Sequence, residues 1–170
     1  MPPSWKSSLA TSPTPPKKAN QGALPRTCLV GVGNDLRGDD SAGLAAVRGI
    51  LARAAASDNF LPLEGGPAPE NLTGAIRKFA PEQVIFIDAA HLEEAPGTIR
   101  WINREEIDGM SASSHSLPLS ILAEYLIREL SCEVRILGIQ PEQNEIGEQL
   151  SEAVQKSVDE IVAAFGDNRP

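Results

Sequence analysis

Aromatic residues, cysteine and histidine are scarce in this chain, and positive charge is outnumbered. Of its 170 residues only 4% are aromatic, two are cysteine and two are histidine. Lys and Arg number 15 against 23 Asp and Glu, which gives a formal net charge of -8. Nucleic acids and anionic membranes attract basic surfaces, so this balance argues against both as partners. Cys28 and Cys132 lie in apolar runs without metal-type spacing, so we expect buried, reduced thiols in a cytoplasmic protein.

Long hydrophobic runs are also missing. Residues 1–26 are rich in Pro, Ser, Lys and Thr and contain no apolar stretch of the kind found in secretory signals or membrane spans. We therefore expect no membrane insertion, a disordered N-terminal tail over residues 1–26 and one folded domain over residues 27–166.

Three familiar catalytic or metal-binding patterns are absent. The chain contains no GxSxG, no HExxH and no CxxC. A serine hydrolase, a zinc metalloprotease of the HExxH type and a structural zinc site therefore lose their usual support. If the chain is an enzyme, its chemistry rests on other groups.

The hydrophobic pattern alternates between strand-like and helix-like segments along the domain. Strands are predicted at 28–33, 60–63, 83–87, 97–102 and 134–139, and helices at 40–57, 69–79, 117–130 and 147–165. Such alternation predicts an α/β fold, a single-domain three-layer α/β/α sandwich with a mostly parallel sheet, of the phosphorylase/hydrolase-like kind. The segment 97–102 is the candidate antiparallel edge strand.

The most informative segment is the glycine-rich turn at 33–43, GNDLRGDDSAG, which follows the first strand. It could be a nucleotide-binding turn, but its spacing departs from GxGxxG and it ends in Asp39 and Asp40. Two carboxylates at a helix start repel phosphate and suit a cation or acid–base chemistry instead. We also expect at least one of the two to cap the following helix.

Further acidic residues follow other predicted strands. Asp88 ends the most apolar strand, and Glu64 follows the second strand. Ligands of open α/β sheets bind beyond the carboxyl ends of the strands, which is where this pattern puts Asp39, Asp40, Glu64 and Asp88. All four are candidates, and Glu64 is secondary because a solvated turn residue is at least as common there.

The two histidines complete the set of candidate ligands. His115 lies in a serine-rich loop, and His91 follows Asp88 by three residues. A lone loop histidine is more often a surface residue than a ligand. If His115 does meet the two carboxylates, this mixture of oxygen and nitrogen suits a divalent ion such as nickel or zinc.

Five segments carry a more specific signal. They are GVGNDLRGDDSAG at 31–43, GGPAPEN at 65–71, IDA at 87–89, SSHSLPL at 113–119 and GIQP at 138–141. In this order they resemble the [NiFe]-hydrogenase maturation endopeptidases, and most closely the HycI-like subgroup that serves group 4 hydrogenases. The resemblance implies a cytoplasmic protease, classed with the aspartic type, that removes the C-terminal extension of a hydrogenase large-subunit precursor after nickel insertion.

The resemblance also implies the site. Asp40, Asp88 and His115 match the family's metal-contacting and catalytic positions, whereas His91 has no counterpart. Asp39, Glu64 and His91 are therefore kept as secondary candidates. The nickel would be supplied by the precursor, and no organic cofactor is expected. A monomer is the default expectation for an enzyme that meets each precursor once.

Two other functions remain open at this point. The acidic edge could belong to a non-catalytic metal or nucleotide binding module, which would bind its ligand without cleaving anything. Alternatively, the same carboxylates could serve a general peptidase, which would hydrolyse short peptides without any hydrogenase precursor.

Overall fold

Five strands form one sheet in the order β2-β1-β3-β5-β4 in the computed structural model of the chain. The structure describes residues 4–7, 25–53, 56–102, 106, 118–147 and 149–167. The strands are β1 (Thr27–Val32), β2 (Phe60–Gly66), β3 (Gln83–Ala89), β4 (Ile99–Ile102) and β5 (Glu133–Ile139). The helices are α1 (Ser4–Ser7), α2 (Ala42–Arg53), α3 (Thr73–Phe79), α5 (Leu119–Leu130) and α6 (Glu152–Asp167), with 3-10 turns η1 (Gly38–Ser41) and η2 (Pro69–Leu72).

The sheet is parallel except at one edge. β1 pairs in parallel with both β2 and β3, and β3 pairs in parallel with β5. β4 runs antiparallel to β5 at the edge of the sheet, which confirms the predicted edge strand. After β1 the chain adds β2 on one side and then β3 on the other, so the strand order reverses between β1 and β3. Such a reversal leaves a crevice at the carboxyl ends of the two strands.

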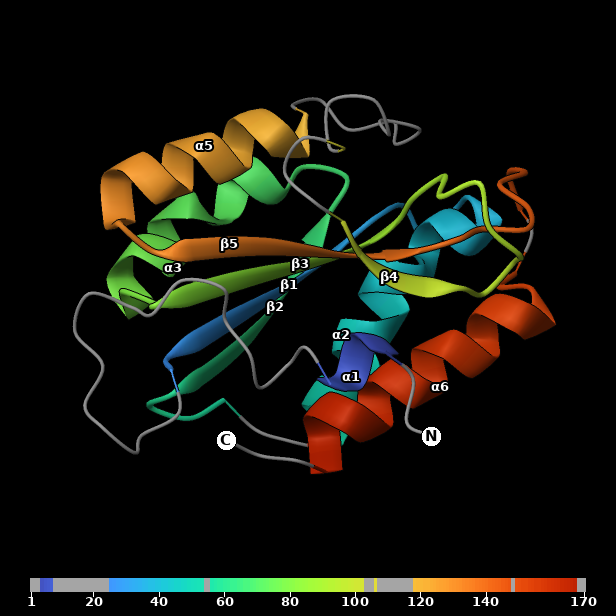
Figure 1. Ribbon diagram of the computed structural model, residues 1–170, viewed down its shortest axis with the longest axis horizontal. Coiled ribbons are helices and arrows are strands. Elements are labelled where there is room, and N and C mark those ends of the chain that lie inside the picture. Colours follow the sequence, from blue (N-terminus) through green and yellow to red (C-terminus); the bar gives the residue numbers. More distant parts are fainter. Residues whose placement is uncertain are drawn as a thin grey trace.

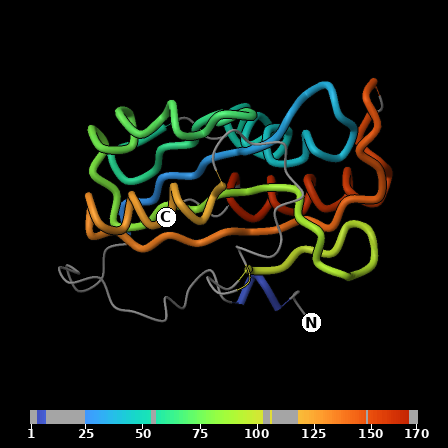
Figure 2. The backbone as a smooth tube through the Cα atoms, turned by 90° about the horizontal axis from the view of Figure 1, so that it is seen from above, coloured from blue at the N-terminus to red at the C-terminus, as the bar shows by residue number. Residues whose placement is uncertain are grey.

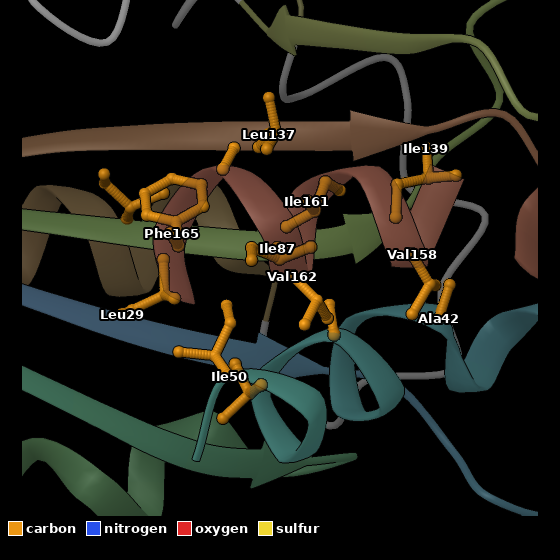
Figure 3. Packing of buried hydrophobic residues seen from close by; sticks show 14 of the residues in the cluster. Leu29, Ala42, Ile50, Ile87, Leu137, Ile139, Val158, Ile161, Val162 and Phe165 are labelled. Carbon is orange, nitrogen blue, oxygen red and sulfur yellow. The ribbon is translucent and has the colours of Figure 1, made fainter. Parts of the chain in front are cut away.

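Helices cover both faces of the sheet, which confirms the three-layer prediction (Figure 1). On one face, α2 and α6 pack over inward-facing residues of the strands. Figure 3 shows this layer, where Ile50 of α2 and Ile161 of α6 lie over Leu29 and Ile87 of the sheet. The apolar stripes of both helices are fully buried there, as expected for helices packed on a sheet.

On the opposite face, α3 and α5 cover the alternate residues of the same strands. Val30, Phe86 and Leu126 belong to this second core. Both cysteines also lie in it, buried, and neither forms a disulfide. The prediction of buried, reduced thiols is therefore confirmed.

The burial of Cys28 leads to a testable consequence. Burial, reinforced by the neighbouring Cys132, raises the pKa of the Cys28 thiol from its ordinary value of 9.0 to about 12. At pH 8 only about one thiol in ten thousand would be ionised, so we expect negligible alkylation in the native protein and complete alkylation in denaturant. Peptide mass mapping after iodoacetamide treatment measures this, and rapid native labelling of Cys28 would contradict it.

The raised pKa of Cys28 also bears on stability at high pH. Because the thiol has a higher pKa in the folded state than in the unfolded state, the free energy of unfolding should decline as pH rises above 9.0.

The N-terminal segment differs from the sequence-based expectation. Residues 1–26 were predicted to be a disordered tail, but residues 4–7 form the helical turn α1, and Trp5 is buried beside α6. The Trp5 indole N–H donates to Glu160, and the Trp5 carbonyl accepts from the Trp101 indole at 2.9 Å. A buried aromatic side chain, with one tertiary hydrogen bond from its indole and one to its backbone carbonyl, stabilises order that composition alone does not predict.

The bounds of several helices also differ from the predicted ones, and α3, for example, begins at Thr73 after η2 instead of at residue 69. α2 ends at Arg53 instead of residue 57, and α6 begins at Glu152 instead of residue 147. Gly147 has φ +84°, a left-handed conformation that a helix start does not use. Ser151 instead precedes α6 and accepts a hydrogen bond from Val154 N–H, as a capping serine does. None of the helices in the described part of the chain is both long and apolar enough to cross a membrane.

Candidate functional site

Two buried carboxylates lie at the strand reversal. Asp40 comes from η1, between β1 and α2, and Asp88 is the sixth residue of β3. Their side chains are only 6% and 5% exposed, respectively. Buried charges are costly unless the surrounding structure compensates them, so their presence at this edge marks a candidate active site.

The turn that carries Asp40 has a fixed backbone. Asp40 N–H donates to the Arg37 carbonyl at 2.9 Å, and the Asp40 carbonyl accepts from Asn34 N–H at 3.2 Å. Gly33 has φ +134°, and a Cβ placed there would lie 1.8 Å from the Asp40 carbonyl oxygen. Only glycine fits at this point, which explains why the turn begins with one.

A second close approach brings the chain segment of Asp40 to that of Asp88. α2 begins against the ends of β1 and β3, where a Cβ on Gly43 would lie 2.1 Å from the Ile87 carbonyl oxygen and 2.3 Å from that of Val32. Both clashes would be with backbone, which cannot yield as a side chain can. Gly43 follows Asp40 by three residues and Ile87 directly precedes Asp88, so this contact places the two acidic segments side by side.

The direction of the Asp88 side chain follows from the alternation of β3. Ile87 packs in the core under α2 and α6, whereas Phe86 packs in the core under α3 and α5. Successive side chains of a strand point to opposite faces, so Asp88 belongs to the face of α3 and α5. His115 lies outside the described residues, and α5, which follows it along the chain, begins at Leu119 on this same face.

Asp39 has a structural role, unlike its neighbour Asp40. Its fully buried carboxylate accepts hydrogen bonds from the backbone N–H groups of Glu142, Gln143 and Ser151 at 2.7–3.0 Å, and from the Ser151 hydroxyl at 2.9 Å. Asp39 was a secondary site candidate and a candidate cap of its own helix, but its carboxylate is bound instead to the connection between β5 and α6. It fastens that connection to the turn that carries Asp40.

Gln140 has a comparable positioning role that the sequence analysis did not assign. Its side-chain oxygen accepts from Leu92 N–H at 2.7 Å, and its side-chain amide donates to the Pro141 carbonyl. These bonds tie the loop after Asp88 to the end of β5. The only sequence signal was the GIQP segment, because a polar residue at the end of an apolar strand does not reveal which loop it binds.

Glu64 and His91, two further secondary candidates, are exposed near the same edge. Glu64 accepts a hydrogen bond from Arg48 at 2.7 Å, and Arg48 also makes a bidentate pair with Asp35. These hydrogen bonds, to Asp35 first and then to Glu64, raise the pKa of Arg48 above its already high value. Glu64 is thus engaged in a surface ion network at the rim of the site.

Within the described ranges, no three His, Cys, Asp or Glu side chains are grouped as a metal site requires. The described part of the site therefore supplies two carboxylates. Such a pair can share a cation with an additional ligand, or can take up a proton from water beside a polarised carbonyl.

The chain matches known proteins over most of this domain. The family model described as HycI, hydrogenase maturation protease, matches residues 45–167. The hydrogenase 3 maturation protease of Escherichia coli K12 is 39% identical over 116 residues, which are 67% of this chain and 72% of that protein.

Solved structures agree with these matches. The crystal structure of the [NiFe] hydrogenase maturation protease HycI from Thermococcus kodakarensis superposes with a TM-score of 0.76 at 28% identity, covering 84% of this chain and 90% of that one. The solution structure of the endopeptidase HycI from E. coli gives a TM-score of 0.71 at 32% identity, covering 80% and 86%. The sheet, the acidic turn and these matches together lead to one conclusion: the chain belongs to the HycI family of hydrogenase maturation proteases, whose members are peptide hydrolases.

Proposed function

We propose that this protein removes the C-terminal extension of a [NiFe]-hydrogenase large-subunit precursor once nickel has been inserted. The observation that carries the proposal is the pair of buried carboxylates, Asp40 and Asp88, at the crevice between β1 and β3. The relative in E. coli is named a hydrogenase 3 maturation protease, which supports a hydrogenase precursor as the substrate.

The nickel in this proposal belongs to the precursor. Asp40, Asp88 and His115 would contact that nickel, which would serve as proof that the metal centre has been loaded. An incomplete set of protein ligands suits this role, because the precursor's own ligands then fill the remaining coordination positions. Binding of a divalent cation would also compensate the negative charge of the two buried carboxylates.

Chain connectivity supports the inclusion of His115. Because β5 is parallel to β3 and directly follows α5, the helix runs antiparallel to these strands and its first residue lies toward their carboxyl ends. Leu119 follows His115 by four residues, and four residues span at most about 14 Å. This short separation along the chain supports His115 as the third group of the proposal, and the exposed His91 offers a natural comparison.

The proposed cleavage is a hydrolysis assisted by carboxylate. One carboxylate would accept a proton from water while the water oxygen attacks the scissile carbonyl carbon. The resulting tetrahedral carbon would expel the amine of the extension, which takes up a proton as the C–N bond breaks. Contact with the precursor's nickel would hold the peptide in register for this attack.

The decisive experiment compares nickel-loaded and nickel-free precursor. The purified protein is mixed with each form, and mass spectrometry follows the loss of the C-terminal peptide. We expect cleavage of the loaded form only. A His115→Ala variant should lose this activity, and a His91→Ala variant, which replaces the other histidine, should keep it.

Other outcomes would select other functions. Cleavage of both precursor forms would keep the protease but reject nickel as its checkpoint. If neither form were cleaved while the protein still bound nickel, a binding module would replace the proposed function. Hydrolysis of short unrelated peptides would favour a general peptidase.

A further inference from the structure

Two neighbouring loops, one of them the turn that carries Asp40, each expose a large apolar side chain. Leu36 is 69% exposed and Ile146 is 78% exposed, the two highest values among the large hydrophobic residues that the structure describes. Their loops are joined by a hydrogen bond from Gly147 N–H to the Leu36 carbonyl at 2.9 Å. The two loops lie side by side at the right of Figures 1 and 2. Leu36 and Ile146 are called the apolar pair below.

The apolar pair is held in place by its surroundings. Leu36 N–H donates to the Asn34 side chain at 3.0 Å, and the neighbouring Asp35 is gripped by Arg48. Asp39 fastens the start and the end of the connection that carries Ile146. A loop whose backbone is already held in place loses little backbone freedom on binding, which favours a role in recognition.

The position of the pair identifies what it binds. Leu36 and Asp40 belong to one short turn, so a polypeptide whose scissile bond reaches Asp40 passes close to Leu36. Building on the proposed function, we infer that the apolar pair is a docking point for an apolar stretch of the precursor polypeptide beside the scissile bond. The charged Asp35, Arg48 and Glu64 form a polar rim on one side, as at other protein interfaces.

A second copy of this chain fits the apolar pair less well than the precursor does. Two side chains expose far less surface than the roughly 800 Å² per partner that stable interfaces bury. A second copy seated on the pair would also cover the approach to Asp40. A precursor makes further contacts through the cleavage site itself, so a small apolar contact is sufficient there.

The test is a kinetic comparison with a double variant, Leu36→Ala together with Ile146→Ala. With nickel-loaded precursor and the mass-spectrometric assay, we expect KM to rise about tenfold or more while kcat stays within twofold, because burial of each side chain contributes to binding and not to chemistry. The control is Leu51→Ala, which should leave KM unchanged. Leu51 is exposed in the last turn of α2, at the end of the helix remote from the turn that carries Asp40.

The outcomes separate this inference from the proposed function. A KM within twofold of wild type would overturn the docking role while wild-type cleavage still upheld the protease. If the wild-type protein did not cleave the precursor at all, the proposed function would fail first. Light scattering of the free protein tests whether the apolar pair binds a second copy of this chain. A dimer that the double variant abolishes would show that it does, and would overturn the inference.

Discussion

An Asp88→Asn variant is expected to cleave nickel-loaded precursor at least about 100-fold more slowly than wild type, and Asp40→Asn should behave alike. Asparagine keeps the size of the side chain but removes the charge that would bind the precursor's nickel or accept a proton from water. Both side chains are buried at the crevice, where water screens such charges weakly. The measurement is the initial rate of peptide release, followed by mass spectrometry.

The control for this prediction is Asp58→Asn, which makes the same chemical change at an exposed turn before β2, at the opposite end of the sheet. It should process precursor at the wild-type rate. Thermal unfolding of all three variants separates a chemical loss from a folding loss. Wild-type rates for both Asp40→Asn and Asp88→Asn would show that neither carboxylate takes part in cleavage.

An Asp39→Ala variant is expected to lose about 3 kcal/mol of unfolding free energy, although Asp39 neighbours the proposed catalytic residue. The change removes the acceptor of four hydrogen bonds and leaves two buried donors of Ser151 and two part-buried backbone N–H groups, of Glu142 and Gln143, without their partner. For a chain of this size the unfolding temperature should fall by about 10 °C. Urea titration and calorimetry measure the two quantities.

The matched control is Asp35→Ala, which removes a carboxylate from the same turn. Asp35 is half exposed and pairs with Arg48, and surface ion pairs contribute at most about 1 kcal/mol. A loss of less than about 1 kcal/mol in Asp39→Ala would contradict the structural role of Asp39. The two neighbouring positions should therefore differ in effect: substitution of Asp39 should lower the free energy of unfolding, and substitution of Asp40 should lower the cleavage rate.

The elements that the sequence predicted well are those with strong local signals. The apolar run of β3 and the helical spacing of α5 depend on neighbouring residues alone, so periodicity is sufficient to find them. The sequence predicted the ends of helices less accurately. α6 begins five residues later than predicted, because its start is decided by Ser151, whose hydroxyl also bonds to Asp39 far away in the chain.

Asp39 and Asp40 show why a site is harder to predict than a fold. The two residues are identical in type and adjacent, and both are buried. Their local pattern does not separate them. The family resemblance assigned the site role to Asp40, and only the structure shows what Asp39 binds, because its partners lie more than 100 positions away along the chain. Burial of Trp5 was missed for the same reason, since its partners Trp101 and Glu160 lie 96 and 155 positions away along the chain.

The sequence by itself determined the α/β class, the placement of acidic residues at strand ends and the resemblance to hydrogenase maturation proteases, because these depend on residue order and local periodicity. The tertiary structure decided that β1 and β3 are neighbours, that Gly43 lets α2 begin against both, and that Leu36 lies beside Ile146. The physical reason is that strand pairing and helix packing join segments distant in the chain. Only that packing brings Asp40 and Asp88 to one crevice.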